Sequence, residues 1–238
     1  MMPEKTWRTD SVLRLLLGIF ATWSAGILLA GALVHFGPAA SSTHATLLSM
    51  VIVTMAFHGA SLFWIKAFLK SENISWPDAF GFNQPAPGRA LGWAVLVAVV
   101  VLPVAWGLQQ LSSQIMVSNH LNPEPQQMVQ EIQKGGISTF QQVYLGFITM
   151  IAAPVVEEII FRGIVYPTIK RAGYPKVALW GTSILFSFTH QNTPAFLSLV
   201  FFAVILTLLY EETGNLLAPI VAHSCFNATN LIMLLVTK

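Results

Sequence analysis

The stretch WAVLVAVVVLPVAWGL, residues 93–108, contains no charged side chain. A helix that crosses a bilayer needs about 20 mostly apolar residues, and this run is flanked by more of them. The rest of the chain of 238 residues has the same character: 55% of it is hydrophobic, 9% is charged and the mean hydropathy is +0.66. Soluble domains carry about 25% charged residues. The sequence therefore predicts an integral membrane protein.

Six further segments are long and apolar enough to be candidate spans. The seven candidates lie near residues 13–35, 45–69, 89–111, 140–168, 176–190, 194–212 and 215–236. The first follows a basic N-terminus and exceeds the roughly 7–15 apolar residues of a secretory signal, so we expect it to be retained as a span. We predict an all-α, polytopic transmembrane helical bundle in which residues 1–238 form one membrane domain and the site lies in an intramembrane cavity.

Basic residues predict the orientation, because cytoplasmic loops retain Lys and Arg. With the N-terminus inside, seven spans place ten basic residues on the inner side and two, Lys134 and Lys238, on the outer side. The inner ones are Lys5, Arg8, Arg14, Lys66, Lys70, Arg89, Arg162, Lys170, Arg171 and Lys176. The net charge of +2 gives no indication of a nucleic-acid partner.

The fourth candidate span carries charge where lipid is expected, in the stretch APVVEEIIFRG, residues 153–163. One charge at the centre of a bilayer helix costs about 2.5–3.5 kcal/mol. Glu158 and Arg162 are four residues apart and share a helix face, which predicts an ion pair. Glu157 lies about 100° further round the helix and is left without that partner. The alternative is that both glutamates sit at a solvated helix end.

Two later spans repeat the four-residue spacing, with Phe186 and His190 on one and His223 and Asn227 on the other. Glu157 precedes the basic Lys170 by a helical rise of roughly 20 Å, and His190 follows Lys176 by roughly 21 Å. The acid and this imidazole therefore reach similar depths. Taken alone, each histidine is more often a hydrogen-bonded packing residue than a catalytic one. Ionisable groups inside a membrane, however, mark functional sites.

The three motifs EEIIFR, FSFTH and HSCFN, in this order on separate spans, resemble the CPBP family. That family comprises type II CAAX prenyl endopeptidases and bacteriocin-processing or immunity proteins of the ABI group. The resemblance covers about residues 150–236, and the first 140 residues carry no motif that we can match.

The resemblance implies a glutamate-dependent intramembrane protease. Matched motif by motif, Glu157 is the general base that activates water, and His190 holds and polarises that water. His223 and Asn227 form the oxyanion hole, a role in which one donor is worth about 2.7–4 kcal/mol. Supporting positions are Glu158, Arg162 and Phe186.

The sequence is compatible with a metal-free site and with a zinc site. Zinc takes three or four N, O or S ligands, and Glu157, His190 and His223 supply three. The helical His-Glu-x-x-His motif is absent, and Asn227 suits an oxyanion better than a metal. We therefore expect no cofactor, with zinc as the alternative.

Other polar residues favour structural roles. His58, in the second span, is typical of a packing residue. Glu211 and Glu212 are not followed by an arginine four residues on, and indicate a solvated helix end. We interpret the single cysteine, Cys225, as a small apolar residue that packs between helices. Asn230 is a weak candidate for a further polar contact.

Two other functions compete with proteolysis. Intramembrane Glu, His and Arg also mark transporters and proton relays, although no internal repeat is found here. A non-catalytic immunity or scaffold protein of the same fold would keep the pocket and act by binding. For the enzyme we expect a peptide or protein substrate at the membrane, with or without a lipid and with CAAX-like ends as one class. The compact chain indicates a bacterial cell (inner) membrane.

Overall fold

The computed structural model describes residues 7–36, 43–84, 87–124, 129–130 and 138–236. Within these ranges the regular structure is helical. The helices are α1 (Thr9–Phe36), α2 (Thr43–Thr54), η1 (Met55–Gly59), α3 (Ala60–Ser71), α4 (Trp76–Phe80), α5 (Pro87–Ser118), α7 (Thr139–Phe147), η2 (Ile148–Ala152), α8 (Ala153–Glu158), η3 (Ile159–Val165), α9 (Tyr166–Arg171), α10 (Pro175–Thr189), α11 (Phe196–Thr213) and α12 (Leu217–Val236). The elements labelled η are π-helical turns.

Six helices in the described residues are long and apolar enough to cross a membrane, which confirms an all-α polytopic protein. They are Thr9–Phe36, Leu47–Ser71, Gly88–Ser118, Thr139–Arg171, Phe196–Thr213 and Leu217–Val236. The fifth predicted span, residues 176–190, corresponds to α10, which has 15 residues. That length is a rise of about 22 Å, less than the hydrocarbon thickness of about 30 Å, so the described residues contain six candidate full-length spans where the sequence predicted seven.

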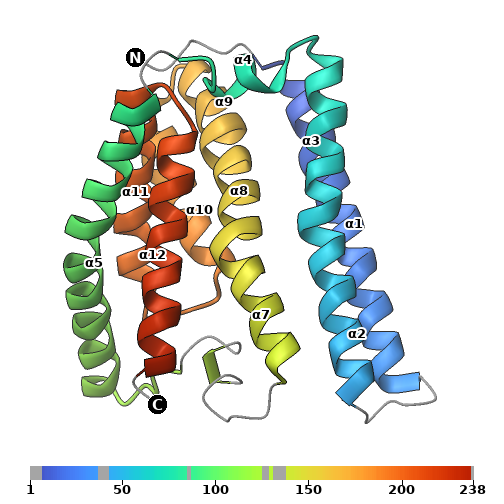
Figure 1. Cartoon of the computed structure of the whole chain (residues 1–238), viewed down its shortest axis with the longest axis vertical. Helices are drawn as coiled ribbons and strands as arrows, with labels where there is room; N and C mark the ends of the chain where they lie inside the picture. Colours follow the sequence, from blue (N-terminus) through green and yellow to red (C-terminus); the bar gives the residue numbers. More distant parts are fainter. Residues whose placement is uncertain (1–6, 37–42, 85–86, 125–128, 131–137, 237–238) are drawn as a thin grey trace. The chain divides into compact units, whose positions relative to one another are not determined.

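The chain divides into two compact units, and the prediction of a single membrane domain stays a prediction. In the unit Trp7–Ala79, α1 packs along α2, η1 and α3 (Figure 1). Close approach depends on two glycines of α1. A Cβ at Gly26 would lie 2.2 Å from the methyl group of Ala56, and one at Gly18 would lie 2.6 Å from the ring of Trp64.

In the unit Phe80–Lys238, α12 packs against both α5 and α8, and α11 packs against α5 and α10 (Figure 1). Small side chains on α5 and α12 let these helices approach closely, as in other membrane bundles. Larger rings and leucines of α11 fill the space between them. The buried core consists of Ala90, Ala94, Val101, Ala105, Phe202, Leu206, Leu209, Ala218, Ala222 and Phe226.

One continuous helix of 33 residues, from α7 to α9, carries the charged motif. A capping box at Ser138 and Gln141 starts it. Two prolines, Pro154 and Pro167, follow the two π-helical turns η2 and η3. A proline removes a backbone donor and crowds the carbonyl four residues earlier. Those carbonyls belong to Met150 and Gly163, which lie inside η2 and η3. The wider turns therefore relieve the two clashes.

The loop after Phe80 is held against the turn between α11 and α12. Gly81 has φ +73°, and the Leu216 amide donates to the Phe80 carbonyl at 2.9 Å. A Cβ at Gly81 would lie 1.9 Å from the carbonyl oxygen of Gly214. The ring of Phe80 also fills the space beside Gly163, where a Cβ would meet it at 2.8 Å. These contacts fix η3, the turn that carries Arg162.

We expect Gly81→Ala to lower the free energy of unfolding by about 1–3 kcal/mol or more, because a positive φ is strained in alanine and the methyl group meets backbone. Thermal unfolding of the purified protein in detergent measures this. Gly107→Ala is the matched control, since no atom lies within 4 Å of its Cβ position in α5. The control should be neutral or stabilising by up to about 1 kcal/mol. Equal effects of the two substitutions would contradict the packing described for Gly81.

Candidate active site

The ion pair predicted within the charged motif is present and deeply buried. Arg162 Nη1 donates to Glu158 Oε1 at 2.9 Å, and the two side chains are 2% and 0% exposed. A buried ion pair is stable only when its other donors are also satisfied. The guanidinium meets that condition through α11, because Nη2 donates to the Ala203 carbonyl at 3.0 Å and Nε to Thr207 Oγ1 at 3.4 Å.

Phe186 forms the apolar wall of this site. Its ring centroid lies 4.5 Å from the Arg162 guanidinium carbon, a cation–π contact. The same ring lies 4.6 Å from the imidazole of His190 and 5.7 Å from that of His223. The Phe-x-x-x-His spacing therefore does bring both rings of the motif together, and Phe186 touches every cationic or imidazole group of the cluster.

The sequence did not indicate the strongest contact of His223. Its Nδ1 lies 2.8 Å from Glu158 Oε1, the oxygen that also accepts from Arg162. Phe202 packs edge-on against the same imidazole at 5.4 Å. His223 is thus locked in orientation by a carboxylate and an aromatic ring from two other helices. No spacing rule reaches across helices, so this contact needed the structure.

Glu157 faces the other side of the two imidazoles. Its Oε2 lies 3.7 Å from His190 Nε2 and 4.0 Å from His223 Nε2. This oxygen is buried and has no hydrogen-bond partner in the described part of the chain. The side chains of Glu157 and His190 are 16% and 20% exposed, whereas those of Glu158, Arg162 and His223 are at most 2% exposed. The cluster is therefore accessible on the side of Glu157 and His190.

Both imidazoles use Nδ1 for a structural hydrogen bond and turn Nε2 toward Glu157. His190 Nδ1 lies 2.8 Å from the Phe186 carbonyl oxygen, which can only accept, and His223 Nδ1 faces Glu158. A neutral ring that donates from Nδ1 has a lone pair on Nε2, and Nε2 donates only in the imidazolium form. The space between Glu157 and His190 Nε2 therefore suits a small donor such as water.

Asn227 is held by the π-helical turn η2. Its Nδ2 donates to the Thr149 carbonyl at 2.8 Å. A carboxamide has two N–H donors, so one remains for another acceptor. No hydrogen bond among the described residues joins Asn227 to Glu157 or to either imidazole. Of the four residues predicted to be catalytic, three converge, and Asn227 lies one turn beyond His223.

Most of the other polar residues have structural partners. Asn230 accepts from Trp106 Nε1 at 2.9 Å, which ties α12 to α5. Glu211 accepts from both Tyr166 and Lys170 and so links α11 to α9, where the sequence indicated only a solvated helix end. His58 Nδ1 lies 3.3 Å from the Thr54 carbonyl oxygen, within the unit Trp7–Ala79.

The alternative of a zinc site requires three or four ligand atoms around one point. Among the residues that the structure describes, no group of three or more His, Cys, Asp or Glu side chains meets the spacing of a metal site. Glu157, His190 and His223 come nearest, through the two distances of 3.7 and 4.0 Å.

The helix of the charged motif, α10 with His190 at its end, and the part of α12 that carries His223 fall within one family domain. Residues 139–229 match the family model of the Type II CAAX prenyl endopeptidase, Rce1-like. The family predicted from the three motifs is therefore confirmed for this segment, which begins earlier than the motifs do. No curated protein and no solved structure matches the chain.

The Rce1-like segment contains Glu157, His190, His223 and Asn227, and extends from the capping box of α7 into α12. At the level of the family, it indicates a protease-type hydrolase that acts on a membrane-associated peptide. The unit Trp7–Ala79 lies outside the match.

Proposed function

We propose that this protein is a glutamate-dependent intramembrane endopeptidase that hydrolyses peptide bonds of membrane-associated peptides or proteins. The observation that carries the proposal is the convergence of Glu157 Oε2 on the Nε2 atoms of His190 and His223, while this oxygen accepts no hydrogen bond within the described residues. The Rce1-like match of the surrounding segment supports it. A proton relay would also place acid beside imidazole, but nothing in the match favours transport.

In the proposed mechanism, a water molecule lies between Glu157 and His190 and donates to the carboxylate and to the Nε2 lone pair. Glu157 takes one proton as the water oxygen attacks the peptide carbonyl carbon. Glu157 then gives that proton to the amide nitrogen as the C–N bond breaks. The products are a new amine and a new carboxylic acid, which keeps the second proton of the water until it ionises in solvent. General acid–base catalysis of this kind contributes about 10²–10⁴-fold to a rate.

The oxyanion that forms on the carbonyl needs donors. The free N–H of Asn227 is one. His223 is the second, and it donates from Nε2 in the imidazolium form, for which the Glu158 carboxylate at its Nδ1 is the counter-ion. Glu158, Arg162 and Phe186 hold this imidazole in place. Removing one oxyanion donor typically costs about 10²–10³ in kcat.

We propose a metal-free reaction, and metal analysis together with chelation tests it. Purified protein should contain less than one zinc per chain, and its peptide cleavage should survive treatment with a strong chelator. Stoichiometric zinc, with cleavage lost on chelation and restored by zinc, would instead assign Glu157, His190 and His223 as ligands. As a control, chelation should also leave the thermal unfolding unchanged.

The proposed substrate is a peptide or protein at the membrane, with CAAX-like lipidated ends as one class. We also propose a cytoplasmic N-terminus and a bacterial inner membrane. The orientation depends on the distribution of basic residues. Of these, Arg162 is buried, and Lys5, Lys134 and Lys238 lie outside the described residues.

Proteomic comparison of membranes from cells with wild-type protein or Glu157→Ala identifies substrates, because their precursors accumulate in the variant. An unchanged biological effect of the variant would favour a binding protein.

A further inference from the structure

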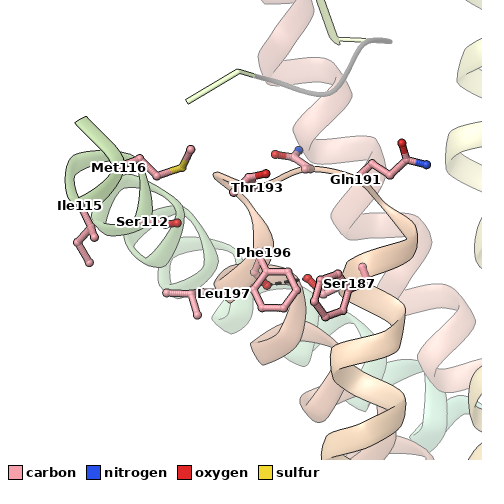
Figure 2. Close-up of a pocket in the computed structure, with 10 residues that line it drawn as sticks. Ser112, Ile115, Met116, Ser187, Gln191, Thr193, Phe196 and Leu197 are labelled. Atoms are coloured by element: carbon pink, nitrogen blue, oxygen red, sulfur yellow. Dashed lines mark hydrogen bonds between the residues drawn. The ribbon is translucent and has the colours of Figure 1, made fainter. Parts of the chain in front are cut away.

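A pocket of about 400 Å³ lies beside the candidate active site, between the end of α5 and the turn that joins α10 to α11 (Figure 2). We propose that this pocket is a subsite for an apolar side chain of the substrate, close to the bond that is cut. This inference depends on the proposed peptidase function and extends it to substrate selection.

The end of α10 contributes residues both to the pocket and to the catalytic cluster, and so places the two close together. Ser187 and Gln191 line the pocket, and each comes one residue after Phe186 or His190, which face the catalytic cluster. Successive residues lie about 100° apart around a helix, so Ser187 and Phe186 put the pocket and the cluster on neighbouring faces of the end of α10, and Gln191 lies in the turn that follows. A helix is about 10–12 Å across and an extended peptide advances about 3.3 Å per residue. The pocket therefore lies about two to four residues from the cleaved bond.

The lining distinguishes a peptide from a pure hydrocarbon chain. The pocket is mostly apolar because its lining includes Ile115 and Met116 of α5, Phe188 of α10, and Phe196 and Leu197 of α11. Gln191 and Thr193 are exposed at its edge. An apolar floor beside exposed polar groups suits a side chain that is attached to a peptide backbone.

The wall nearest the cluster has a defined shape. Ser187 Oγ donates to the Phe196 carbonyl at 2.8 Å, a bond that joins the end of α10 to the start of α11 (Figure 2). Gln191 has φ +48°, so the chain turns sharply directly after His190. Asn192 Oδ1 accepts from the Ala195 amide at 3.2 Å and closes the turn. The subsite and His190 are thus parts of one fixed turn.

Filling the pocket tests the proposal. The assay uses wild-type protein in liposomes and a peptide library in which one position at a time carries Ala, Leu or Phe. Ser112→Phe places a ring in the pocket from α5 and should lower kcat/KM for Leu and Phe peptides about tenfold or more at one position, because apolar pockets discriminate by about 10–200-fold. Cleavage of the Ala peptides should stay close to wild type. Met116→Ala enlarges the pocket and should shift the preference toward Phe.

Leu111→Phe is the matched control, since it adds the same ring one residue away on α5, outside the lining. Equal effects of Ser112→Phe on every peptide, or equal selectivity changes in the control, overturn the subsite while leaving the peptidase function intact. A wild-type protein that cuts no peptide overturns both proposals.

A binding measurement keeps the proposal testable without turnover. A peptide with a benzophenone side chain at the selected position, added to the Glu157→Gln variant in liposomes, should crosslink to residues 112–116 or 191–197. Crosslinks confined to other helices, or competition by phospholipid alone, overturn the assignment to a peptide side chain.

Discussion

Replacing Glu157 with glutamine is expected to lower the rate of peptide cleavage by about 10²–10⁴-fold, the contribution of a general base. The amide keeps the shape of the carboxylate but cannot take a proton from water. Because Glu157 Oε2 makes no hydrogen bond in the described residues and the side chain stays partly exposed, the substitution removes no hydrogen bond of that oxygen. The measurement is the initial rate of cleavage of a fluorogenic peptide by the purified protein in liposomes.

The control for this prediction is Glu212→Gln, which changes an exposed glutamate at the end of α11. It should retain wild-type cleavage. Both variants should unfold within a few degrees of the wild type, so that the loss is assigned to chemistry. Cleavage at the wild-type rate by Glu157→Gln would remove Glu157 as the base.

The second large effect is expected at Arg162, on stability rather than on chemistry alone. Arg162→Met should lower the free energy of unfolding by about 3–5 kcal/mol, the usual result of leaving one buried charge without its partner. The group that loses its arginine partner is Glu158, whose side chain is 0% exposed and retains only the contact with His223 Nδ1. The bonds to Ala203 and Thr207 on α11 are lost as well. Thermal or denaturant unfolding in detergent, with yield of folded protein as a second readout, measures the change.

The double variant Glu158→Gln/Arg162→Met separates charge from packing. It removes both charges, and the amide oxygen introduced by Glu158→Gln can still accept from His223 Nδ1. We expect it to recover at least about half of the lost stability, since coupled pairs are not additive. If the double variant is as unstable as the sum of the two single variants, the ion pair is not the reason for the instability of Arg162→Met.

The helical fold was predictable because its signals are local. Apolar runs gave the spans, and the four-residue spacing gave the Glu158–Arg162 pair that the structure contains. The number of spans was less predictable, because apolar composition continues through α10 although the chain turns after 15 helical residues. The π-helical turns had a readable signal as well, in the prolines four residues beyond Met150 and Gly163.

The site was predictable only in part, since its decisive contacts join separate helices. Depth arguments placed Glu157 near His190, and the two groups do approach to 3.7 Å. The bond between Glu158 and His223, the contacts of Arg162 with α11 and the bond from Asn227 to the Thr149 carbonyl had no sequence signal. Each depends on how the helices are rotated about their axes, which packing decides.

The most direct test of the central claim is cleavage in water enriched in ¹⁸O, with the intact mass of the protein recorded during turnover. Attack by a water activated at Glu157 predicts one solvent oxygen in the new C-terminal carboxylate and an unmodified protein mass throughout. A protein mass raised by the acyl part of the peptide, on Cys225 or a serine, would show a covalent intermediate and contradict direct attack by water.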